Sequence, residues 1–259
     1  MTPNFKIFLV VYDQLHREIM KDLTEEEKKS LVCYSVQPSV LKMITTKIPI
    51  INEWQLPRYD QRYQTLKYYE YGTFPHLLNN DYLIKDLTHV GIMHYDVAFP
   101  KDSINDIYKS FEENPNKICY VTKRKIKDSS YFTIDQFTEI CNYLNKNLEL
   151  DININEAWEG DWISEALSVV PIEVYRKFGE FILKNQYDIE NILNTNRWGI
   201  MNYVKHRICG FIERLWGIYL VYLVHEGYQL EQLSIVHEHG KYNHAHLVDK
   251  QNFLNNFKS

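Results

Sequence analysis

The amino-acid sequence predicts an α/β fold in which a central sheet is flanked by helices. Three observations support this class. A β-branched and aromatic run, residues 5–12, opens the chain, and runs of this composition and length form buried strands. A second apolar run, residues 90–93, ends in a polar cluster. Segments with helical periodicity lie between and after these runs, and strands that alternate with helices form one sheet covered by helices.

The first part of the chain has the pattern of a strand, a helix and a strand. Residues 5–12 predict a central strand, residues 16–30 carry a charged helical pattern, and residues 31–36 predict a second strand. Two strands joined by a helix make the opening half of a nucleotide-binding α/β fold. Residues 61–80 fit a helix that is bent or interrupted at Pro75.

The rest of the chain continues this alternation. The expected elements are a helix over 104–113, a strand over 117–122, a helix over 134–148, a strand over 166–170, helices over 172–184 and 210–224, and a strand over 233–239. The helix over 210–224 is apolar but contains Glu213 and Arg214. Because a buried unpaired charge is costly, we expect this pair to support the architecture. Diphosphate binding by Arg214 is the alternative.

Composition excludes several classes of protein. The 259 residues, 45% of them hydrophobic, suffice for one large core or for a core with an appended subdomain. The net charge of -5 gives no footprint for nucleic acid. The sequence contains neither of the two glycine-rich phosphate loops, which disfavours dehydrogenases and P-loop enzymes, and it has no hydrolase nucleophile elbow.

The sequence also predicts the compartment. Four cysteines lie far apart without a Cys-x-x-Cys pair, so reduced thiols are expected. The apolar run 5–11 is too short for a signal segment or a membrane span, and the apolar stretch 211–224 reads as a buried helix. We therefore expect a cytoplasmic protein without a membrane span.

The polar cluster after the run 90–93 is the strongest candidate site. His94, Tyr95 and Asp96 follow this predicted strand directly, and ligands of open α/β sheets sit at the carboxyl ends of the strands. A His-x-Asp sequence at that edge is a candidate metal or phosphate site. The alternative is that Asp96 caps a turn and that His94 is a histidine of the core.

An acidic and aromatic stretch is a candidate polyol site. Trp158 and Trp162 can stack on sugar faces, while Glu159 or Asp161 can take a proton from a hydroxyl. Asp161 is the preferred base, because the helical segment expected over 163–166 would hold its carboxylate through backbone N–H groups. The alternative is a surface loop whose tryptophans serve as packing anchors.

Two further clusters are ambiguous. Histidines gather near the C-terminus, and alternate residues of a strand there, such as His237 and His239, would share a face. Zinc binding is conceivable, although neither a cysteine nor a His-Glu-x-x-His spacing supports a dedicated site. The basic run 123–127 is interpreted as a solvated loop, with diphosphate binding as the alternative.

Four sequence blocks resemble the signature of a glycosyltransferase family. They are Tyr69-Glu70, Asn79-Asn80, the strand end Gly91-Ile92-Met93-His94-Tyr95, and the helical block Gly210-Phe211-Ile212-Glu213-Arg214-Leu215-Trp216-Gly217-Ile218-Tyr219-Leu220. The family occurs in capsular-polysaccharide loci as a domain of formerly unknown function, and related modules occur in large algal and amoebal viruses. The match spans about residues 68–220 in the correct order, and its last block is the most specific.

This resemblance implies a GT-A fold, with a Rossmann-like mixed central sheet flanked by helices. One domain would span residues 1–259, with a nucleotide-sugar half over about 1–125 and an acceptor half over about 126–259. The family fold binds its nucleotide-sugar through a divalent metal at an Asp-x-Asp motif. The present sequence departs from that motif, because His94 stands where the first aspartate would be.

The resemblance also implies roles for particular residues. His94 and Asp96 would hold Mn²⁺ or Mg²⁺, and His237 or His239 would close the coordination shell. The implied nucleotide-sugar-binding residues are Tyr12, Asp13, Arg58, Glu70, His94, Tyr95 and Asp96. Tyr12 and Asp13 would contact the base and the ribose.

On the acceptor side, the implied binding residues are Trp158 and Trp162. Asp161, or else Glu159, would deprotonate the acceptor hydroxyl if the reaction inverts, a role worth on the order of 10²- to 10⁴-fold in rate. In a retaining enzyme neither residue would need to act in this way.

The resemblance therefore implies a hexosyl- or pentosyltransferase. It would move a sugar from a UDP- or GDP-linked donor to an oligosaccharide or glycoconjugate, in the cytoplasm of the host cell if the chain is viral. A divalent ion would stabilise the charge of the leaving diphosphate. Two alternatives are a non-catalytic GT-A-like carbohydrate-binding or assembly module and a nucleotidyltransferase.

Overall fold

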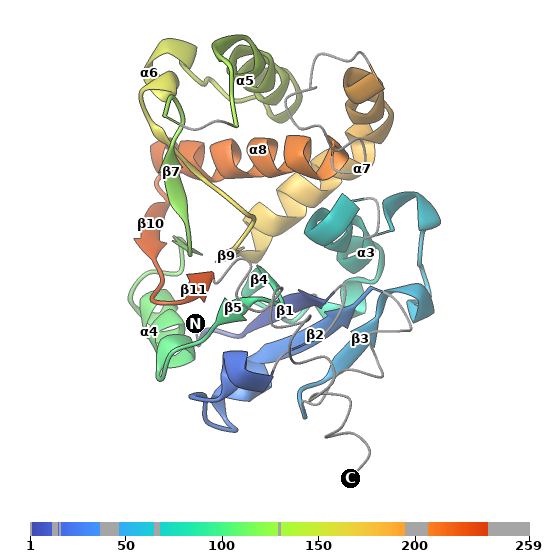
Figure 1. Ribbon diagram of the computed structural model, residues 1–259, viewed down its shortest axis with the longest axis vertical. Helices are drawn as coiled ribbons and strands as arrows, with labels where there is room; N and C mark the ends of the chain where they lie inside the picture. The colour runs from blue at the N-terminus through green and yellow to red at the C-terminus, as the bar shows by residue number, and fades with distance from the viewer. Residues whose placement is uncertain are drawn as a thin grey trace, which may run out of the picture.

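The computed structural model describes residues 2–11, 15, 17–36, 47–64, 68–128, 131–194 and 207–237. Within these residues a seven-stranded sheet lies at the centre, in the order β10-β6-β9-β4-β1-β2-β3 (Figure 1). Its strands are β1 (Phe5–Val11), β2 (Leu31–Ser35), β3 (Ile50–Asn52), β4 (His89–His94), β6 (Lys117–Tyr120), β9 (Ser168–Pro171) and β10 (Gln229–Gln232). The sheet is mixed, because β1 is parallel to β2 and β4 whereas β9 is antiparallel to β4 and β6. The predicted α/β class is confirmed.

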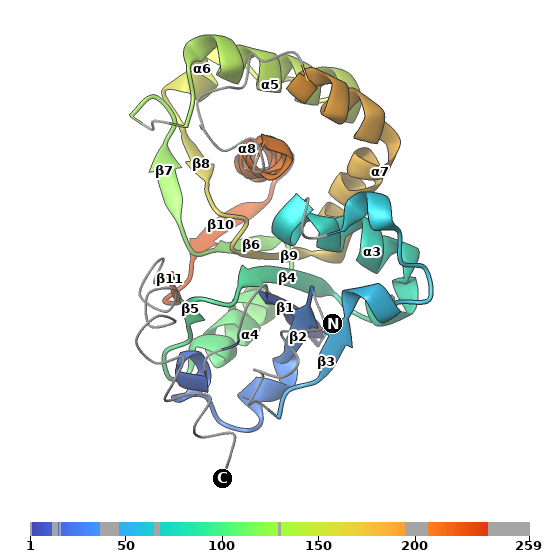
Figure 2. The same ribbon diagram turned by 45° about the vertical axis from the view of Figure 1, so that its right-hand side comes forward.

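Helices cover both faces of this sheet. The α-helices are α3 (Thr73–Asn79), α4 (Ser103–Glu113), α5 (Ile134–Leu148), α6 (Ile154–Trp158), α7 (Ile172–Asn194) and α8 (Arg207–Tyr222). Short 3-10 helices include η3 (Glu53–Gln55), η6 (Asp81–Leu83) and η8 (Leu223–Glu226). Figure 2 shows α4 on one face of the sheet and α3, α7 and α8 on the other, with α5 and α6 beyond α8.

Two hydrophobic cores lie on the two faces. Strand β1 sends Phe8 and Val10 into the core that contains residues of α7 and α8, and Ile7 and Leu9 into the core that contains residues of α4. All four side chains are at most 1% exposed. A strand that is buried on both faces needs an unbroken apolar run, and this explains why β1 and β4 stand out in the sequence.

Strands β1 and β4 end at the same edge of the sheet. They pair in parallel with Val10 opposite His94. The polar residues that follow β4 therefore lie at the carboxyl edge of parallel strands, where ligands of α/β sheets bind. Tyr12 and Asp13, which were expected to follow β1 at this edge, lie outside the described residues.

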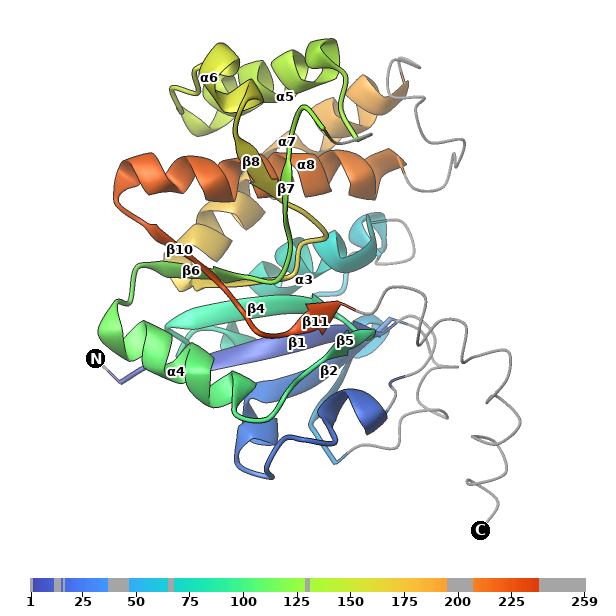
Figure 3. The same cartoon turned by 60° about the vertical axis from the view of Figure 1, so that its left-hand side comes forward.

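Two short antiparallel strand pairs complete the described fold. Strand β5 (Val97–Ala98) pairs with β11 (Val236–His237), and β7 (Lys123–Lys125) pairs with β8 (Asp161–Ile163). Figure 3 shows β11 beside β5 at the edge of the central sheet. The first pair brings the last described residues to the polar segment after β4. The second pair packs against α8.

The single helix expected over 16–30 is wrong. The segment instead forms two 3-10 helices, η1 (Arg17–Met20) and η2 (Glu27–Ser30). The Glu27 carboxylate accepts hydrogen bonds from the backbone N–H and the hydroxyl of Thr24, and the Thr24 hydroxyl accepts from the Glu27 N–H. This reciprocal pattern is a capping box, which starts a new helix at that point.

The helix expected over 61–80 is divided. Its described parts are η4 (Gln61–Tyr63), η5 (Tyr69–Gly72) and α3. Pro75 lies in the first turn of α3, where the missing N–H costs no hydrogen bond. Proline therefore belongs to the start of a helix here and does not bend one.

Two later predictions also change. The helix expected over 172–184 extends to Asn194 as α7. The strand expected over 233–239 is replaced by β10 and β11, which belong to different sheets. Leu233 and Ile235 between them are buried and anchor this crossing. The chain therefore leaves the central sheet after Gln232, before the expected strand begins, and continues to β5.

One described helical stretch, Ile208–Glu226, is long and apolar enough to cross a membrane by length and composition. Of its most hydropathic window, 61% is buried inside the structure. The stretch contains α8, which packs against β8, α5 and α7. Its apolar composition therefore matches the buried helix that the sequence predicted.

Candidate functional site

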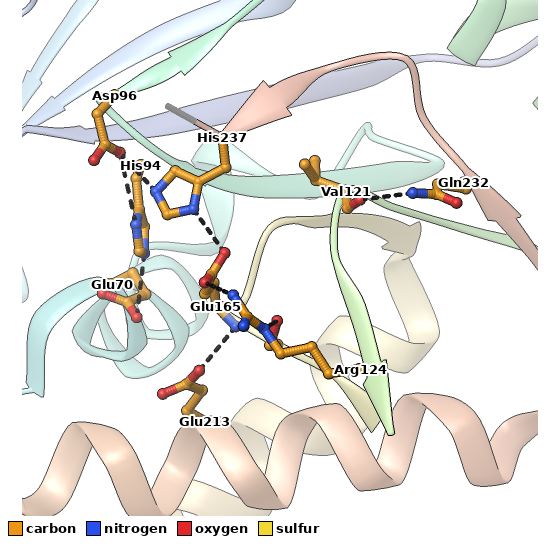
Figure 4. Close-up of polar contacts among 10 residues, drawn as sticks. Glu70, His94, Asp96, Val121, Arg124, Glu165, Glu213, Gln232 and His237 are labelled. Atoms are coloured by element: carbon orange, nitrogen blue, oxygen red, sulfur yellow. Dashed lines mark hydrogen bonds and ion pairs between the residues drawn. The ribbon is translucent and has the colours of Figure 1, made fainter. Parts of the chain in front are cut away.

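Three side chains from separate parts of the chain meet at the carboxyl edge of β4. His94 ends β4, Asp96 lies in the turn before β5, and His237 ends β11. One ligand atom from each lies within 4.8 Å of the others (Figure 4). Because β11 pairs with β5, His237 stands opposite Val97, next to Asp96. The short strand pair thus completes a His-Asp-His cluster.

Asp96 lies between the two imidazole rings. Its Oδ1 is 3.2 Å from His237 Nε2 and 3.8 Å from His94 Nδ1. The other nitrogen of His94, Nε2, is 3.3 Å from Glu70 Oε1. The other nitrogen of His237, Nδ1, is 2.6 Å from Glu165 Oε2. Each ring therefore has Asp96 on one side and a glutamate on the other (Figure 4).

The backbone is strained where it delivers these two glutamates. Tyr69, directly before Glu70, has φ 53°. Glu165 has φ 69° and Ala166 has φ 55°. Side-chain-bearing residues rarely adopt this left-handed region, and each such residue costs on the order of 1–3 kcal/mol. Strain of this kind clusters at functional sites, where the surrounding contacts maintain it.

Three neighbours hold Glu165 in place. Its backbone N–H donates a hydrogen bond to Glu213 Oε1 at 2.9 Å. Arg124 Nη2 donates to Glu165 Oε1 at 2.9 Å, and Arg124 Nε donates to Ser164 Oγ at 3.2 Å. The remaining oxygen, Oε2, faces His237. The carboxylate of Glu165 is therefore clamped between a guanidinium and an imidazole.

The pKa values of the cluster are set by burial and by the charged groups in contact with each side chain. Burial disfavours the charged form of His237, but its contacts with Asp96 and Glu165 outweigh burial and raise its pKa to about 9. Burial alone would raise the pKa of Glu165, but His237 and Arg124 lower it to about 2. Burial raises the pKa of Glu213 to about 7. Strong opposing effects on neighbouring groups are typical of functional sites.

The donor set fits a divalent metal ion. Asp96 offers a carboxylate oxygen, and each histidine turns one ring nitrogen toward it. Histidines that bind metals usually direct their other ring nitrogen to a carboxylate or carbonyl, as His94 does to Glu70 and His237 to Glu165. Carboxylate and imidazole ligands together suit Mn²⁺, whereas Mg²⁺ prefers oxygen alone.

The other predicted nucleotide-sugar residues are placed as follows. Tyr95 is half-buried against the core on the α4 side. Arg58 contacts the end of α3. Its backbone N–H donates a hydrogen bond to Asn80 Oδ1, and its guanidinium donates one to the carbonyl oxygen of Asn79. Their binding roles stay predictions. The predicted binding roles of Tyr12, Asp13 and His239 concern positions outside the described residues.

The two tryptophans of the predicted acceptor stretch lie in different surroundings. Trp162 is fully buried, with its ring 5.0 Å from Phe132 and 5.7 Å from Tyr131. A covered indole does not agree with the predicted role of stacking on a sugar, and it matches the alternative of a packing anchor. Trp158 is half-buried, 5.4 Å from Phe137.

The two predicted base candidates are paired with lysines. Asp161 starts β8, so the helix expected directly after it is wrong. Its carboxylate is 3.3 Å from Lys123 Nζ and 3.1 Å from Lys125 Nζ. Burial acts to raise the pKa of Asp161, but the two lysines outweigh it and lower the pKa below the usual range. Glu159 forms an ion pair with Lys127. A lowered pKa makes Asp161 a weaker base.

Both candidates line a cavity of about 560 Å³. The cavity lies among the β7–β8 pair, α6 and the C-terminal part of α8. Its wall combines apolar side chains with the polar groups of Asp151, Asn153 and His225. The cavity therefore offers both polar and apolar surface beside the predicted acceptor stretch, residues 158–162.

Arg214 has the architectural contacts that the sequence predicted. It is only 7% exposed. Its guanidinium donates hydrogen bonds to the backbone carbonyls of Tyr131 and Gly210. Its neighbour Glu213 differs, because its carboxylate reaches the backbone of Glu165. Sequence reasoning missed Glu165 entirely, and Glu213, a charge in an apolar helix, was the available signal.

No family model matches this chain, and no curated protein matches its sequence. Among solved structures, the fold is similar to the apo structure of the bifunctional glycosyltransferase WbbM, with a TM-score of 0.58 and 12% sequence identity. The match covers 90% of this chain and 45% of that chain, so this chain spans less than half the length of WbbM. At this identity the likeness concerns the fold.

Two fungal structures are less similar. The mannosyltransferase Ktr4p from S. cerevisiae has a TM-score of 0.42 and 9% identity, over 91% of this chain and 71% of that chain. Core-mannan synthase A from Aspergillus fumigatus, in its Mn/GDP form, has a TM-score of 0.40 and 10% identity, over 91% of this chain and 75% of that chain. The likeness in fold rests on WbbM alone, and membership of the capsular and viral family stays a prediction.

Proposed function

We propose that this chain is a glycosyltransferase that moves a sugar from a nucleotide-diphosphate-sugar to a hydroxyl of a glycan or glycoconjugate. The observation that carries the proposal is the cluster of His94, Asp96 and His237 at the carboxyl edge of β4. A fold alone does not define an activity. A carboxylate and two imidazoles at the ligand-binding edge of this fold supply the chemistry that a diphosphate leaving group requires.

A divalent ion, Mn²⁺ or Mg²⁺, would be held by Asp96, His94 and His237. When bound, it would neutralise charge on the diphosphate as the glycosidic bond breaks. The protein's part is to hold these three ligands in place. Arg124 and His237 contact the carboxylate of Glu165, and His237 also contacts that of Asp96. A bound ion would take the place of the proton that His237 shares with Asp96.

The donor would lie along the edge where β1 and β4 end. UDP- and GDP-linked sugars are the proposed donors, and Tyr95, Arg58 and the segment after β1 are the proposed contacts. Glu70 is proposed to act through His94, because its carboxylate is 3.3 Å from that ring. We propose this indirect role for Glu70 in place of direct contact with the sugar, because its carboxylate is buried.

The acceptor would bind at the loop between α6 and β8. The cavity of about 560 Å³ that Glu159 and Asp161 line supports this position. Carboxylates there can accept hydrogen bonds from sugar hydroxyls. Deprotonation by either residue stays a prediction from the sequence, and their lysine partners favour hydroxyl binding over the role of a base.

Two further predictions become part of the proposal. One domain is proposed for residues 1–259, with a nucleotide-sugar half over about 1–125 and an acceptor half over about 126–259. The central sheet, which combines strands from both halves, supports a single unit. A cytoplasmic location is proposed because the described cysteines are free thiols.

A thermal-shift panel of UDP- and GDP-sugars, each with Mn²⁺ and with EDTA, tests the proposed function. We expect at least one nucleotide-sugar to raise the melting temperature with Mn²⁺ and to lose this effect in EDTA, because a ligand that binds the folded state stabilises it. Transfer is then followed as release of the nucleotide diphosphate. A non-catalytic carbohydrate-binding module would respond to glycans alone, and a nucleotidyltransferase would release pyrophosphate from a nucleoside triphosphate.

A further inference from the structure

We propose that Glu165 and Glu213 are positioning residues for the metal site, with Glu213 fixing Glu165 and Glu165 fixing the ring of His237. The inference rests on the proposed metal site and goes beyond its three ligands. Glu165 belongs to no strand and to no predicted motif, whereas Glu213 stands in the helical block of the family resemblance, where the sequence assigns it to the architecture. Both are identified by a chain of contacts that runs from α8 to β11.

The first step is that β11 by itself holds His237 weakly. The strand has two residues and pairs with a strand of two residues. Its other member, Val236, is 48% exposed and buries little apolar surface. Leu233 and Ile235 anchor the approach to the strand, but the imidazole lies beyond them. The orientation of that ring therefore depends on what its own nitrogens contact.

The second step is that Glu165 selects the orientation of the ring. An ionised carboxylate only accepts hydrogen bonds, so the 2.6 Å contact keeps a proton of His237 on Nδ1. Nε2 faces Asp96 at 3.2 Å, and the proton on Nε2 is the one that a metal ion would displace. A carboxylate behind a histidine ligand fixes both the tautomer and the ring plane.

The third step is that Glu165 needs support of its own. Glu165 and Ala166 both have left-handed backbone conformations, which relax unless neighbours hold them. Glu213 accepts the backbone N–H of Glu165 at 2.9 Å, and Arg124 binds one carboxylate oxygen, which leaves the other for His237. Glu213 stands on α8, a helix packed in the core. The core of the protein is thereby connected to the metal ligand.

The test measures binding of Mn²⁺ alone, by calorimetry and by electron paramagnetic resonance of the free ion. Glu165→Ala should weaken Mn²⁺ affinity by about 10- to 100-fold, the usual effect of removing the partner of a histidine ligand. Glu213→Leu removes the acceptor of the Glu165 N–H and should weaken Mn²⁺ affinity in the same direction. Glu213→Gln keeps an oxygen acceptor, so it should bind Mn²⁺ as the wild type does.

The Glu213 pair separates positioning from charge. Glu213→Leu and Glu213→Gln remove the same charge, so equal losses in both would overturn the positioning role. Glu231→Gln is the matched control: its carboxylate is also paired, with Lys117 at 2.6 Å, but on β10. Wild-type affinity in both Glu165→Ala and Glu213→Leu would refute the inference and leave the proposed function intact. A wild-type protein that binds no Mn²⁺ would instead refute the metal part of the proposed function, and the inference with it.

Discussion

Gly217 of α8 lies directly against the carbonyl oxygen of Ile163 in β8. A Cβ atom added to Gly217 would be 2.0 Å from that oxygen and 2.8 Å from Cε3 of Trp162. Both distances are far below van der Waals contact, and the first obstacle is backbone, which cannot rotate away. Glycine is therefore required for α8 to approach the β7–β8 pair. The contact is made at Ile163, two residues before Glu165 in the sequence.

The first prediction is that Gly217→Ala destabilises the protein by about 1–3 kcal/mol or more, because overpacking forces the helix and the strand apart. Urea unfolding measures the change in the free energy of unfolding. Gly210→Ala is the control, because its Cβ would meet only the guanidinium end of Arg214 at 3.0 Å. Equal stability of the two variants would show that α8 does not depend on this contact.

The second prediction concerns pH and Glu213. Burial raises its pKa to about 7, well above the usual value for glutamate. The folded protein therefore holds this proton more tightly than the unfolded chain does, and stability falls as pH rises through that interval. Glu213→Gln removes the ionisable group and keeps the acceptor oxygen. We expect the EDTA-treated variant to melt at a higher temperature than the wild type at about pH 8.

At low pH the difference in melting temperature between Glu213→Gln and the wild type should disappear. Below the usual pKa of a glutamate, Glu213 is protonated in both the folded and the unfolded state, so the variant and the wild type should have converging melting temperatures. Differential scanning fluorimetry from about pH 4 to pH 8 measures the difference. A difference that stays constant across this range would mean that Glu213 titrates normally.

The third prediction distinguishes two roles of Asp161. Its carboxylate contacts Lys123 and Lys125, which lower its pKa. We expect Asp161→Asn to keep most of the transfer rate and to change stability by less than about 1 kcal/mol, the usual range for partly exposed ion pairs. Glu159→Gln is the parallel variant on the same loop. A loss of rate on the order of 10²-fold or more in Asp161→Asn, with unchanged donor affinity, would restore the role of base.

The sequence predicts the sheet well where strands are buried on both faces. Strand β1 places alternate residues in two different cores, so its apolar run is continuous and easily recognised. The segment 16–30 fails for a local reason, because the Thr24–Glu27 capping box starts a new helix within a charged pattern that looks continuous. Short strands such as β11 are also unpredictable, because their partner lies far away in the sequence.

The candidate site also combines residues that the sequence reveals with residues that it does not. His94 and Asp96 are visible because they follow a strong strand directly. Among the described residues, the pairing of β11 with β5 brings His237 to the cluster, a contact that composition cannot reveal. Glu165 is invisible for two physical reasons: its backbone is left-handed, and its partner His237 is 72 residues away.

Trp162 illustrates the opposite error. Two indoles and two carboxylates around a glycine have the composition of a sugar site, but composition does not say which face of a strand is buried. In the structure, β8 turns Trp162 into the core beside α8 and leaves Asp161 to the lysines of β7. A chemical interpretation of a motif therefore depends on a burial pattern that a three-residue strand cannot show.

The most direct test of the account is the affinity for GDP and UDP, measured by calorimetry in Mn²⁺ and in EDTA. Asp96 is 2% exposed and lies between both histidines, so Asp96→Ala should remove metal-assisted binding, with the melting temperature as the check on folding. The account predicts that at least one nucleotide binds more tightly by an order of magnitude or more in Mn²⁺, and that Asp96→Ala loses this difference. Equal affinities in Mn²⁺ and EDTA for the wild type, together with sugar transfer by Asp96→Ala, would contradict it.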